Sequence, residues 1–204
     1  ELMQKDVASC REDIRKMNGL PAEQKLGIGV DRLDYTKGIV ERFRAIERLL
    51  EMNPEWIGRF SFIQIAAPTR SGIDEYQHHE AQVRAMAAQI NACFGREGPP
   101  PIVLKVEHHD TDEVYECYRG ADLCFVSSLH DGMNLVAKEF VASREDERGV
   151  LLLSQFTGAA IELTEALIVN PYDLEGASAA FASALQMSIE EQRDRMRSMR
   201  SFLS

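Results

Sequence analysis

Residues 26–52 read LGIGV, then DRLDYTKG, then IVERFRAIERLLEM. The first segment is apolar or glycine throughout, which is typical of a strand that helices cover on both faces of a parallel sheet. The last segment has the length and the mixture of apolar and charged residues of a surface helix. A buried strand, a short polar loop and a helix form the repeating unit of parallel α/β sheets. This stretch therefore predicts an α/β fold.

The rest of the chain repeats this order. We expect strands near residues 26–30, 60–67, 102–106, 123–126, 150–153 and 167–169. We expect helices near residues 39–52, 73–94, 111–119, 134–143 and 174–186, with a short turn at 158–163. A lead-in helix within residues 1–20 and a surface helix over residues 188–204 complete the pattern. The prediction is one domain over residues 1–204, built as a doubly wound parallel sheet.

Composition and charge narrow the function classes. The net charge of −10 argues against a nucleic-acid or anionic-membrane surface, because both need clustered positive charge. No apolar run approaches the roughly 18–20 residues that a membrane-spanning helix needs. The four cysteines lack CxxC spacing, which favours reduced thiols in a cytoplasmic protein. Because the numbering opens at Glu1, we expect a segment of a longer chain.

Two loops that follow strands carry side chains suited to an anion. Arg32 and Lys37 are predicted just ahead of a helix, where the positive end of the helix dipole disfavours cations, so they indicate a negatively charged ligand. In the run Asp131-Gly132-Met133-Asn134, the glycine lets the backbone approach a ligand, and the following N–H groups can face an anion. A diphosphate fits both loops together.

Plainer interpretations stay open at this point. Arg32 and Lys37 could be solvated charges that pair with Asp31 and Asp34, and Asp131-Gly132 is a common turn signal. The loop after the first strand is not a P-loop, because it lacks the GxxxxGK pattern. The residues alone therefore indicate an anion-binding α/β domain and no more.

Longer motifs add a resemblance. They occupy residues 29–38 (GVDRLDYTKG), 131–139 (DGMNLVAKE), 153–160 (LSQFTGAA) and 168–172 (IVNPY). In this order they resemble the trehalose-6-phosphate synthases, glycosyltransferase family 20, whose GT-B fold has two Rossmann-like domains facing a cleft. The chain is similar to the second, donor-binding domain. The resemblance implies transfer of glucose from UDP-glucose to glucose 6-phosphate with retention. It also implies that the N-terminal acceptor domain is absent here and that the last helix is truncated.

The resemblance also implies roles for individual residues. Arg32, Lys37 and Asp131 are the expected catalytic residues: the two cations hold the donor diphosphate and the carboxylate faces the glucose hydroxyls. The other expected donor-binding residues are His109, Gly132, Met133, Asn134, Leu135, Val136 and Glu139. Among these, Glu139 is expected at the ribose and His109 near the uracil. Arg70 is expected to reach the acceptor phosphate.

The implied chemistry requires no metal and no cofactor. The cations stabilise the departing UDP, whose phosphate oxygen takes the acceptor proton, so Asp131 positions the sugar and does not attack it. His78–His79 and His108–His109 are adjacent pairs whose side chains diverge, so we expect no metal site. The alternatives are a glucosylglycerol-phosphate synthase and a non-catalytic sugar-phosphate-binding domain. The fragment alone is expected to bind UDP weakly, to transfer nothing and to self-associate as a homo-oligomer.

Overall fold

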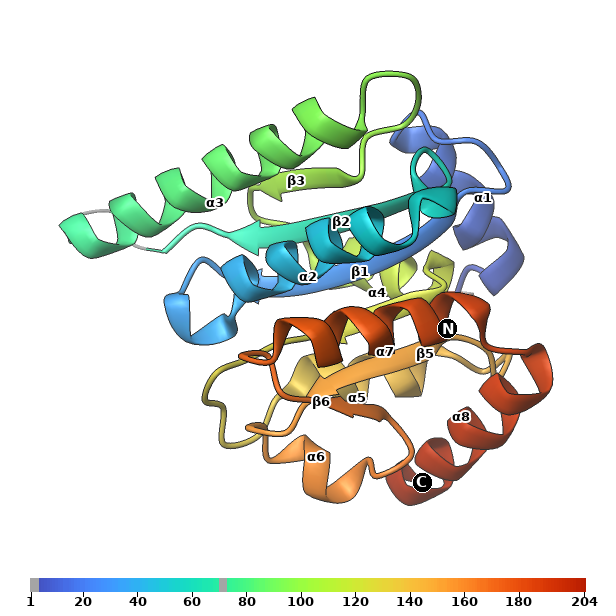
Figure 1. Ribbon diagram of the computed structural model, residues 1–204. Coiled ribbons are helices and arrows are strands. Elements are labelled where there is room, and N and C mark those ends of the chain that lie inside the picture. The colour runs from blue at the N-terminus through green and yellow to red at the C-terminus, as the bar shows by residue number, and fades with distance from the viewer. Residues whose placement is uncertain (1–3, 70–72) are drawn as a thin grey trace.

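The computed structural model describes residues 4–69 and 73–204. Its centre is a six-stranded, wholly parallel sheet in the order β3-β2-β1-β4-β5-β6 (Figure 1). The strands are β1 (Lys25–Arg32), β2 (Phe60–Ala67), β3 (Ile102–Val106), β4 (Leu123–Val126), β5 (Val150–Ser154) and β6 (Leu167–Val169). This confirms the predicted α/β fold with a doubly wound parallel sheet.

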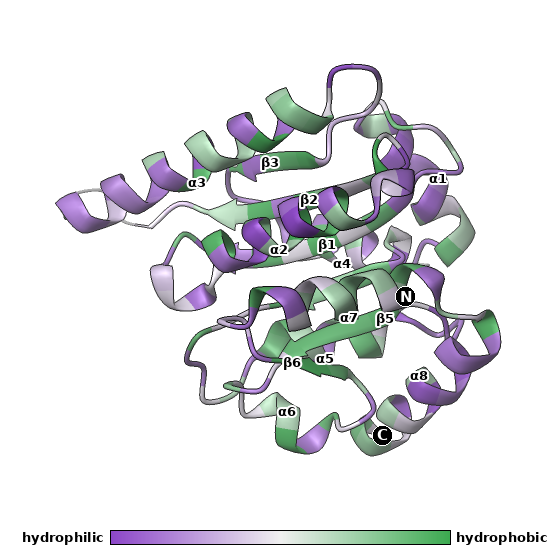
Figure 2. Cartoon of the chain, in the orientation of Figure 1, coloured by the Kyte–Doolittle hydropathy of each residue, from purple (hydrophilic) through white to green (hydrophobic). Residues whose placement is uncertain are grey.

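Helices cover both faces of the sheet. One layer consists of α2 (Ile39–Met52), α3 (Asp74–Phe94) and α7 (Leu174–Gln186). The opposite layer consists of α1 (Val7–Met17), α4 (Thr111–Gly120), α5 (Leu135–Ser143), the short α6 (Ala159–Glu162) and α8 (Ile189–Leu203). Two 3₁₀ turns, Tyr35–Lys37 and Pro54–Trp56, flank α2. Figure 2 shows hydrophobic strands at the centre and hydrophilic outer helix surfaces, most clearly along α8.

Side chains of one strand alternate between the two layers. In β1, Leu26 and Ile28 pack against the layer of α1, α4 and α5. Gly27, which lies between them, faces the layer of α2, α3 and α7, and an added Cβ there would lie 2.6 Å from the ring of Phe62 of β2. The glycine therefore makes room for aromatic packing. Phe181 of α7 completes this packing, with its ring centroid 6.3 Å from that of Phe62.

The strand after the lead-in helix runs further than predicted. The sequence indicated 26–30, but β1 pairs with β2 as far as Arg32, opposite Ala67. Arg32 is therefore the last residue of a strand, and the prediction that it sits in the loop just ahead of a helix is wrong. Lys37 does precede α2, within the 3₁₀ turn Tyr35–Lys37. Among the described residues, no helix is long and apolar enough to cross a membrane.

Candidate functional site

A cavity of about 460 Å³ lies at the carboxyl ends of β1 and β4. The strand order reverses between these two neighbours, so the connections that leave them cover opposite faces and open a crevice, where α/β sheets bind ligands. Nine of the predicted site residues line the cavity: Arg32, Lys37, His109, Asp131, Met133, Asn134, Leu135, Val136 and Glu139. The structure thus brings together residues from three separate stretches of the chain, 32–37, 109 and 131–139.

Lys37 is delivered to the cavity by a tight turn. The carboxylate of Asp34 caps this turn by accepting hydrogen bonds from the N–H and the hydroxyl of Thr36, both at 2.9 Å. Gly38 then adopts φ 69°, a left-handed conformation that glycine tolerates, and the chain enters α2. The ammonium group of Lys37 donates to Oδ2 of Asp131 at 2.9 Å.

Asp131 is held by its loop on the other side of the cavity. Its N–H donates to the carbonyl of Phe156, and its own carbonyl accepts from the N–H of Gly158 at 2.9 Å. The Met133 N–H donates to Oδ1 at 3.2 Å, and the Asn134 side-chain amide donates to Oδ2 at 3.1 Å. The carboxylate is thereby fixed on both oxygens.

These contacts lower the pKa of Asp131. Burial acts against the charged form and raises the pKa, but the hydrogen bonds from Lys37, Met133 and Asn134 outweigh it. The net pKa lies below the ordinary value of 3.8. The carboxylate is therefore charged at neutral pH and acts as a hydrogen-bond acceptor rather than as an acid.

The N-terminus of α5 opens onto the cavity. Asn134, at φ 67°, caps the helix by accepting the N–H of Ala137 on its side-chain oxygen at 3.0 Å. Leu135 and Val136 occupy the first turn, where N–H groups lack acceptors within the helix, and both line the cavity. Their N–H groups and the helix dipole provide an electropositive wall suited to an anion.

Gly132 does not line the cavity, in contrast to the other predicted members of its loop. An added Cβ there would meet nothing within 4 Å, and its φ lies outside the left-handed region. Neither packing nor backbone conformation requires glycine at this position. The expectation that it allows a ligand to approach closely stays a prediction.

Arg32 lies at the mouth of the cavity with its side chain 68% exposed. Its guanidinium is 3.9 Å from Asp34, which is the loose pairing that the plainer interpretation anticipated. That interpretation fails for Lys37, which pairs with neither Asp31 nor Asp34 but with Asp131. Arg32 is therefore a solvated cation and Lys37 a half-enclosed one.

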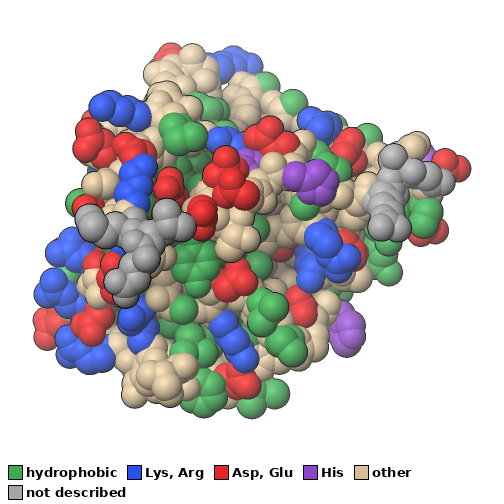
Figure 3. Space-filling view, turned by 180° about the vertical axis from the view of Figure 1, so that it is seen from behind, with side chains coloured by type: hydrophobic (Ala, Val, Ile, Leu, Met, Phe, Trp, Pro, Cys, Tyr) green, Lys and Arg blue, Asp and Glu red, His purple; other side chains and the backbone are tan. Residues whose placement is uncertain are grey.

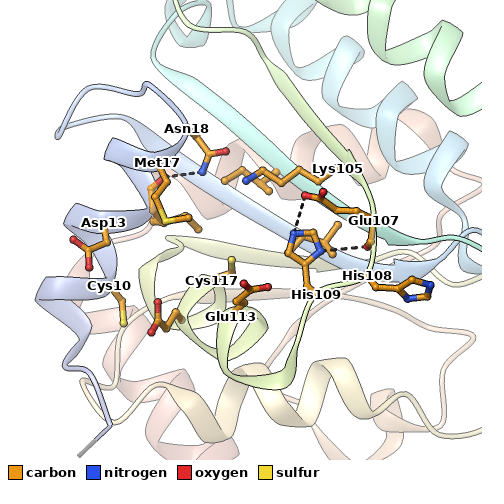
Figure 4. Close-up of a pocket in the computed structure, with 14 residues that line it drawn as sticks. Cys10, Asp13, Met17, Asn18, Lys105, Glu107, His108, His109, Glu113 and Cys117 are labelled. Atoms are coloured by element: carbon orange, nitrogen blue, oxygen red, sulfur yellow. Dashed lines mark hydrogen bonds and ion pairs between the residues drawn. The ribbon is translucent and has the colours of Figure 1, made fainter.

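Glu139 and His109 also line the cavity. Burial raises the pKa of Tyr118, so its phenol stays protonated and donates to Glu139 Oε2 at 3.4 Å. Figure 4 shows His109 folded back toward Glu107, with ring-nitrogen contacts of 3.3 Å to its carbonyl and carboxylate, while His108 points away. His109 also lines a neighbouring cavity of about 270 Å³. Arg70, the predicted acceptor residue, lies outside the described residues.

The charges on the face shown in Figure 3 are mixed. In Figure 3, which views the described residues from the side opposite Figure 1, acidic and basic side chains are interspersed. Such a pattern is typical of a solvated surface and differs from the continuous basic field that nucleic-acid binding needs.

Sequence reasoning missed the buried polar group beneath the site. Arg42 on α2 is fully buried and bonds to Asp31, Gln64 and Ser127. One signal was available: position 42 falls three residues after Ile39, on the apolar face of the helix. A cation on that face predicts a buried polar partner.

Comparisons with known proteins agree with this geometry. A family model described as glycosyltransferase family 20 matches residues 1–204. A bifunctional trehalose-6-phosphate synthase/phosphatase from Thermoproteus tenax is 42% identical over 195 residues, which are 96% of this chain and 27% of that protein. A UDP-forming α,α-trehalose-phosphate synthase from Pichia angusta is 42% identical over 179 residues, 88% of this chain and 38% of that protein.

Solved structures show the same fold. A UDP-forming α,α-trehalose-phosphate synthase from Burkholderia xenovorans, in complex with glucose-6-phosphate, has a TM-score of 0.90 at 41% identity, and the match covers 97% of this chain and 45% of that one. An E. coli protein bound with UDP-2-fluoro glucose has a TM-score of 0.89 at 38% identity, with 97% and 45% covered. The chain thus spans less than half the length of these relatives. It belongs to glycosyltransferase family 20.

Proposed function

We propose that this chain is the donor-binding half of a retaining glucosyltransferase. The reaction transfers glucose from UDP-glucose to glucose 6-phosphate and gives trehalose 6-phosphate and UDP. One observation carries the proposal: Lys37 and Asp131 meet beside the N-terminus of α5, in a cavity with Arg32 at its mouth. The names of the relatives, and the UDP-2-fluoro glucose bound to one of them, support it.

The charges of the site suit a nucleoside diphosphate sugar. The diphosphate is placed between the cations of Arg32 and Lys37 and the first turn of α5, where Leu135 and Val136 offer N–H groups. Negative charge that builds on the departing UDP is stabilised there by groups already in position. The ribose is placed at Glu139 and the base toward His109, both of which line the same cavity.

Asp131 has the properties of a positioning acceptor. When the diphosphate attracts Lys37, Oδ2 of Asp131 loses one donor and can accept a glucose hydroxyl instead. Its Oδ1 keeps the Met133 N–H, and its backbone is tied to Phe156 and Gly158. In the proposed mechanism the acceptor proton moves to the leaving phosphate oxygen, and no enzyme carboxylate attacks the sugar.

A second domain completes the proposed enzyme. Exposed apolar side chains lie on the segments that follow the carboxyl ends of the strands, among them Tyr35, Met133, Leu135 and Tyr172, each at least 58% exposed. Apolar surface of this kind favours burial against a partner. We place the N-terminal acceptor domain there, with homo-oligomer formation as a second use of this surface when that domain is absent. The proposed enzyme is cytoplasmic.

A domain exchange tests the proposal. The segment of the Burkholderia xenovorans enzyme that matches this chain, 45% of its length, is replaced by residues 1–204. We expect the chimera to form trehalose 6-phosphate from UDP-glucose and glucose 6-phosphate, and Lys37→Ala within it to abolish turnover. Assays with glycerol 3-phosphate address the glucosylglycerol-phosphate alternative. A folded chimera that binds UDP without forming any glycosyl product would favour a non-catalytic sugar-phosphate-binding domain.

A further inference from the structure

The guanidinium of Arg42 is fully buried beneath the candidate site, and each of its N–H groups has an acceptor. Nε donates to the Ser127 hydroxyl at 2.9 Å. One terminal nitrogen donates to Asp31 Oδ2 at 2.5 Å and to Gln64 Oε1 at 2.6 Å. The other donates to Asp31 Oδ1 at 3.3 Å and to the carbonyl of Lys37 at 3.4 Å. A buried charge is tolerated only when it is paired and hydrogen-bonded in this way.

These acceptors come from four segments that meet under the cavity. Asp31 is the penultimate residue of β1, Gln64 lies in β2, Ser127 follows β4, and the Lys37 carbonyl belongs to the turn before α2. The Ser127 hydroxyl also donates to the Gly38 carbonyl at 2.7 Å, so the network holds this turn at two consecutive carbonyls.

The backbone is adapted to this arrangement. A Cβ at Gly29 would lie 2.4 Å from the terminal nitrogen of Arg42. A Cβ at Gly38 would lie 2.1 Å from the carbonyl oxygen of Ser127. Gly29 belongs to the Gly27-Ile28-Gly29 run of the first strand, and the absence of a side chain there leaves space for the guanidinium of Arg42.

We propose that Arg42 is a positioning residue of the donor site. It anchors the Lys37–Gly38 turn to the ends of β1, β2 and β4, and so directs the ammonium group of Lys37 toward Asp131 and the first turn of α5. It touches no substrate and acts only through Lys37. This inference rests on the proposed function, because it assigns Lys37 to the donor diphosphate.

The chain offers a matched control. Arg15 is another buried arginine, 1% exposed, which bonds to the carbonyls of Gln24 and Gly120 and to Asp122. These partners precede β1 and β4, at the amino edge of the sheet. Arg15→Lys and Arg42→Lys therefore remove comparable buried hydrogen bonds at opposite edges, and only the second is expected to disturb the site.

The test is a double-mutant cycle on UDP affinity, measured by calorimetry on the chain with Arg42→Lys, Lys37→Ala and both changes. We expect Arg42→Lys to weaken UDP binding about tenfold, within the range for coupled residues, and to add less than about twofold when Lys37 is already alanine. Arg15→Lys should lower the melting temperature without changing UDP affinity. If the role of Arg42 is purely structural, Arg42→Lys should resemble Arg15→Lys: the melting temperature falls and UDP affinity does not change.

A milder variant covers the case in which Arg42→Lys does not fold. Ser127→Ala removes the hydroxyl that links Arg42 to the Gly38 carbonyl, and should weaken UDP binding about threefold, but only while Lys37 is present. Unchanged UDP affinity in a folded Arg42 or Ser127 variant would overturn the inference. So would a double variant whose loss of UDP affinity equals the product of the losses in the two single variants. An unaltered chain that binds no UDP would instead contradict the proposed function.

Discussion

The ammonium group of Lys37 lies 2.9 Å from Oδ2 of Asp131, although 94 positions separate the two residues. The contact joins the turn after β1 to the loop after β4, across the point where the strand order reverses. A diphosphate that attracts the lysine would release one carboxylate oxygen for a sugar hydroxyl. In the proposed function, the same two side chains bind each other when the site is empty and the two parts of a nucleotide sugar when it is filled.

The titration of Asp131 should depend on Lys37. In the folded chain the pKa of Asp131 lies below 3.8, since the hydrogen bonds to its carboxylate outweigh the effect of burial. In Lys37→Met the lysine hydrogen bond is lost and burial remains, so the pKa should rise. Carboxyl ¹³C NMR titration measures both values, and an identical midpoint in the two proteins would contradict the importance of the pair.

The same shift makes a prediction about stability. Folding lowers the pKa of the Asp131 carboxylate below the value of the unfolded chain, near 3.8. The carboxylate therefore stabilises the folded state fully at pH values above 3.8, and this stabilisation is lost as the pH falls through the pKa of the folded state. Asp131→Asn should therefore lower the free energy of unfolding most at neutral pH. Urea titrations at pH 7 and pH 3 measure the difference, which should shrink at the lower pH; an undiminished difference at pH 3 would argue against the assigned shift.

Two glycines near the site should differ in how strongly a change to alanine affects stability. Gly38→Ala should destabilise the chain by at least about 2 kcal/mol, because φ is 69° and the new Cβ would meet the Ser127 carbonyl at 2.1 Å. Gly132→Ala should change stability by less than about 0.5 kcal/mol, since nothing lies within 4 Å. UDP binding should nevertheless weaken in Gly132→Ala if a ligand approaches the backbone there. Thermal melts and calorimetry separate the two effects.

Phe181 should matter for folding and not for binding. Its ring packs edge-on against Phe60 and Phe125, with centroid distances of 5.3 and 5.5 Å. Phe181→Ala removes a fully buried ring and should cost about 3–5 kcal/mol of unfolding free energy in urea titrations. UDP affinity at a temperature where the variant is folded should equal that of the unaltered chain; a large loss would mean that α7 contributes to the site.

UDP binding should not depend on a divalent metal. In the proposal, the diphosphate charge is balanced by Arg32, Lys37 and the first turn of α5. Calorimetric titrations in the presence of EDTA and in the presence of Mg²⁺ should therefore give the same affinity. Binding that requires Mg²⁺ would show that the cations of the chain are insufficient.

Much of the fold could be predicted because strong local patterns encode it. The strand at Phe60–Ala67 and the helix at Ile39–Met52 have the predicted bounds. The strand is a short, mostly apolar segment, and the helix has apolar and charged residues at helical spacing. The end of β1 was missed because Asp31 and Arg32 are polar. Their strand conformation is set by pairing with β2, which lies far away in the sequence.

The sequence did predict nine residues that line one cavity, but not the contacts among them. Lys37 and Asp131 were both identified, yet their pairing depends on the strand order, which local patterns do not reveal. Asp31 was considered a partner for Lys37, whereas the structure pairs it with the buried Arg42. The charge of Arg42 on the apolar face of α2 was the available clue, but its partners lie on four other segments.

The most direct test of the central claim is calorimetric titration of UDP into the chain, with GDP in parallel, beside an Arg32→Ala/Lys37→Ala variant. Lys16→Ala/Arg84→Ala serves as a control, because those cations form surface pairs on α1 and α3. The account predicts saturable UDP binding that the control retains and the Arg32→Ala/Lys37→Ala variant loses. Equal UDP affinity in that variant and in the unaltered chain would contradict it.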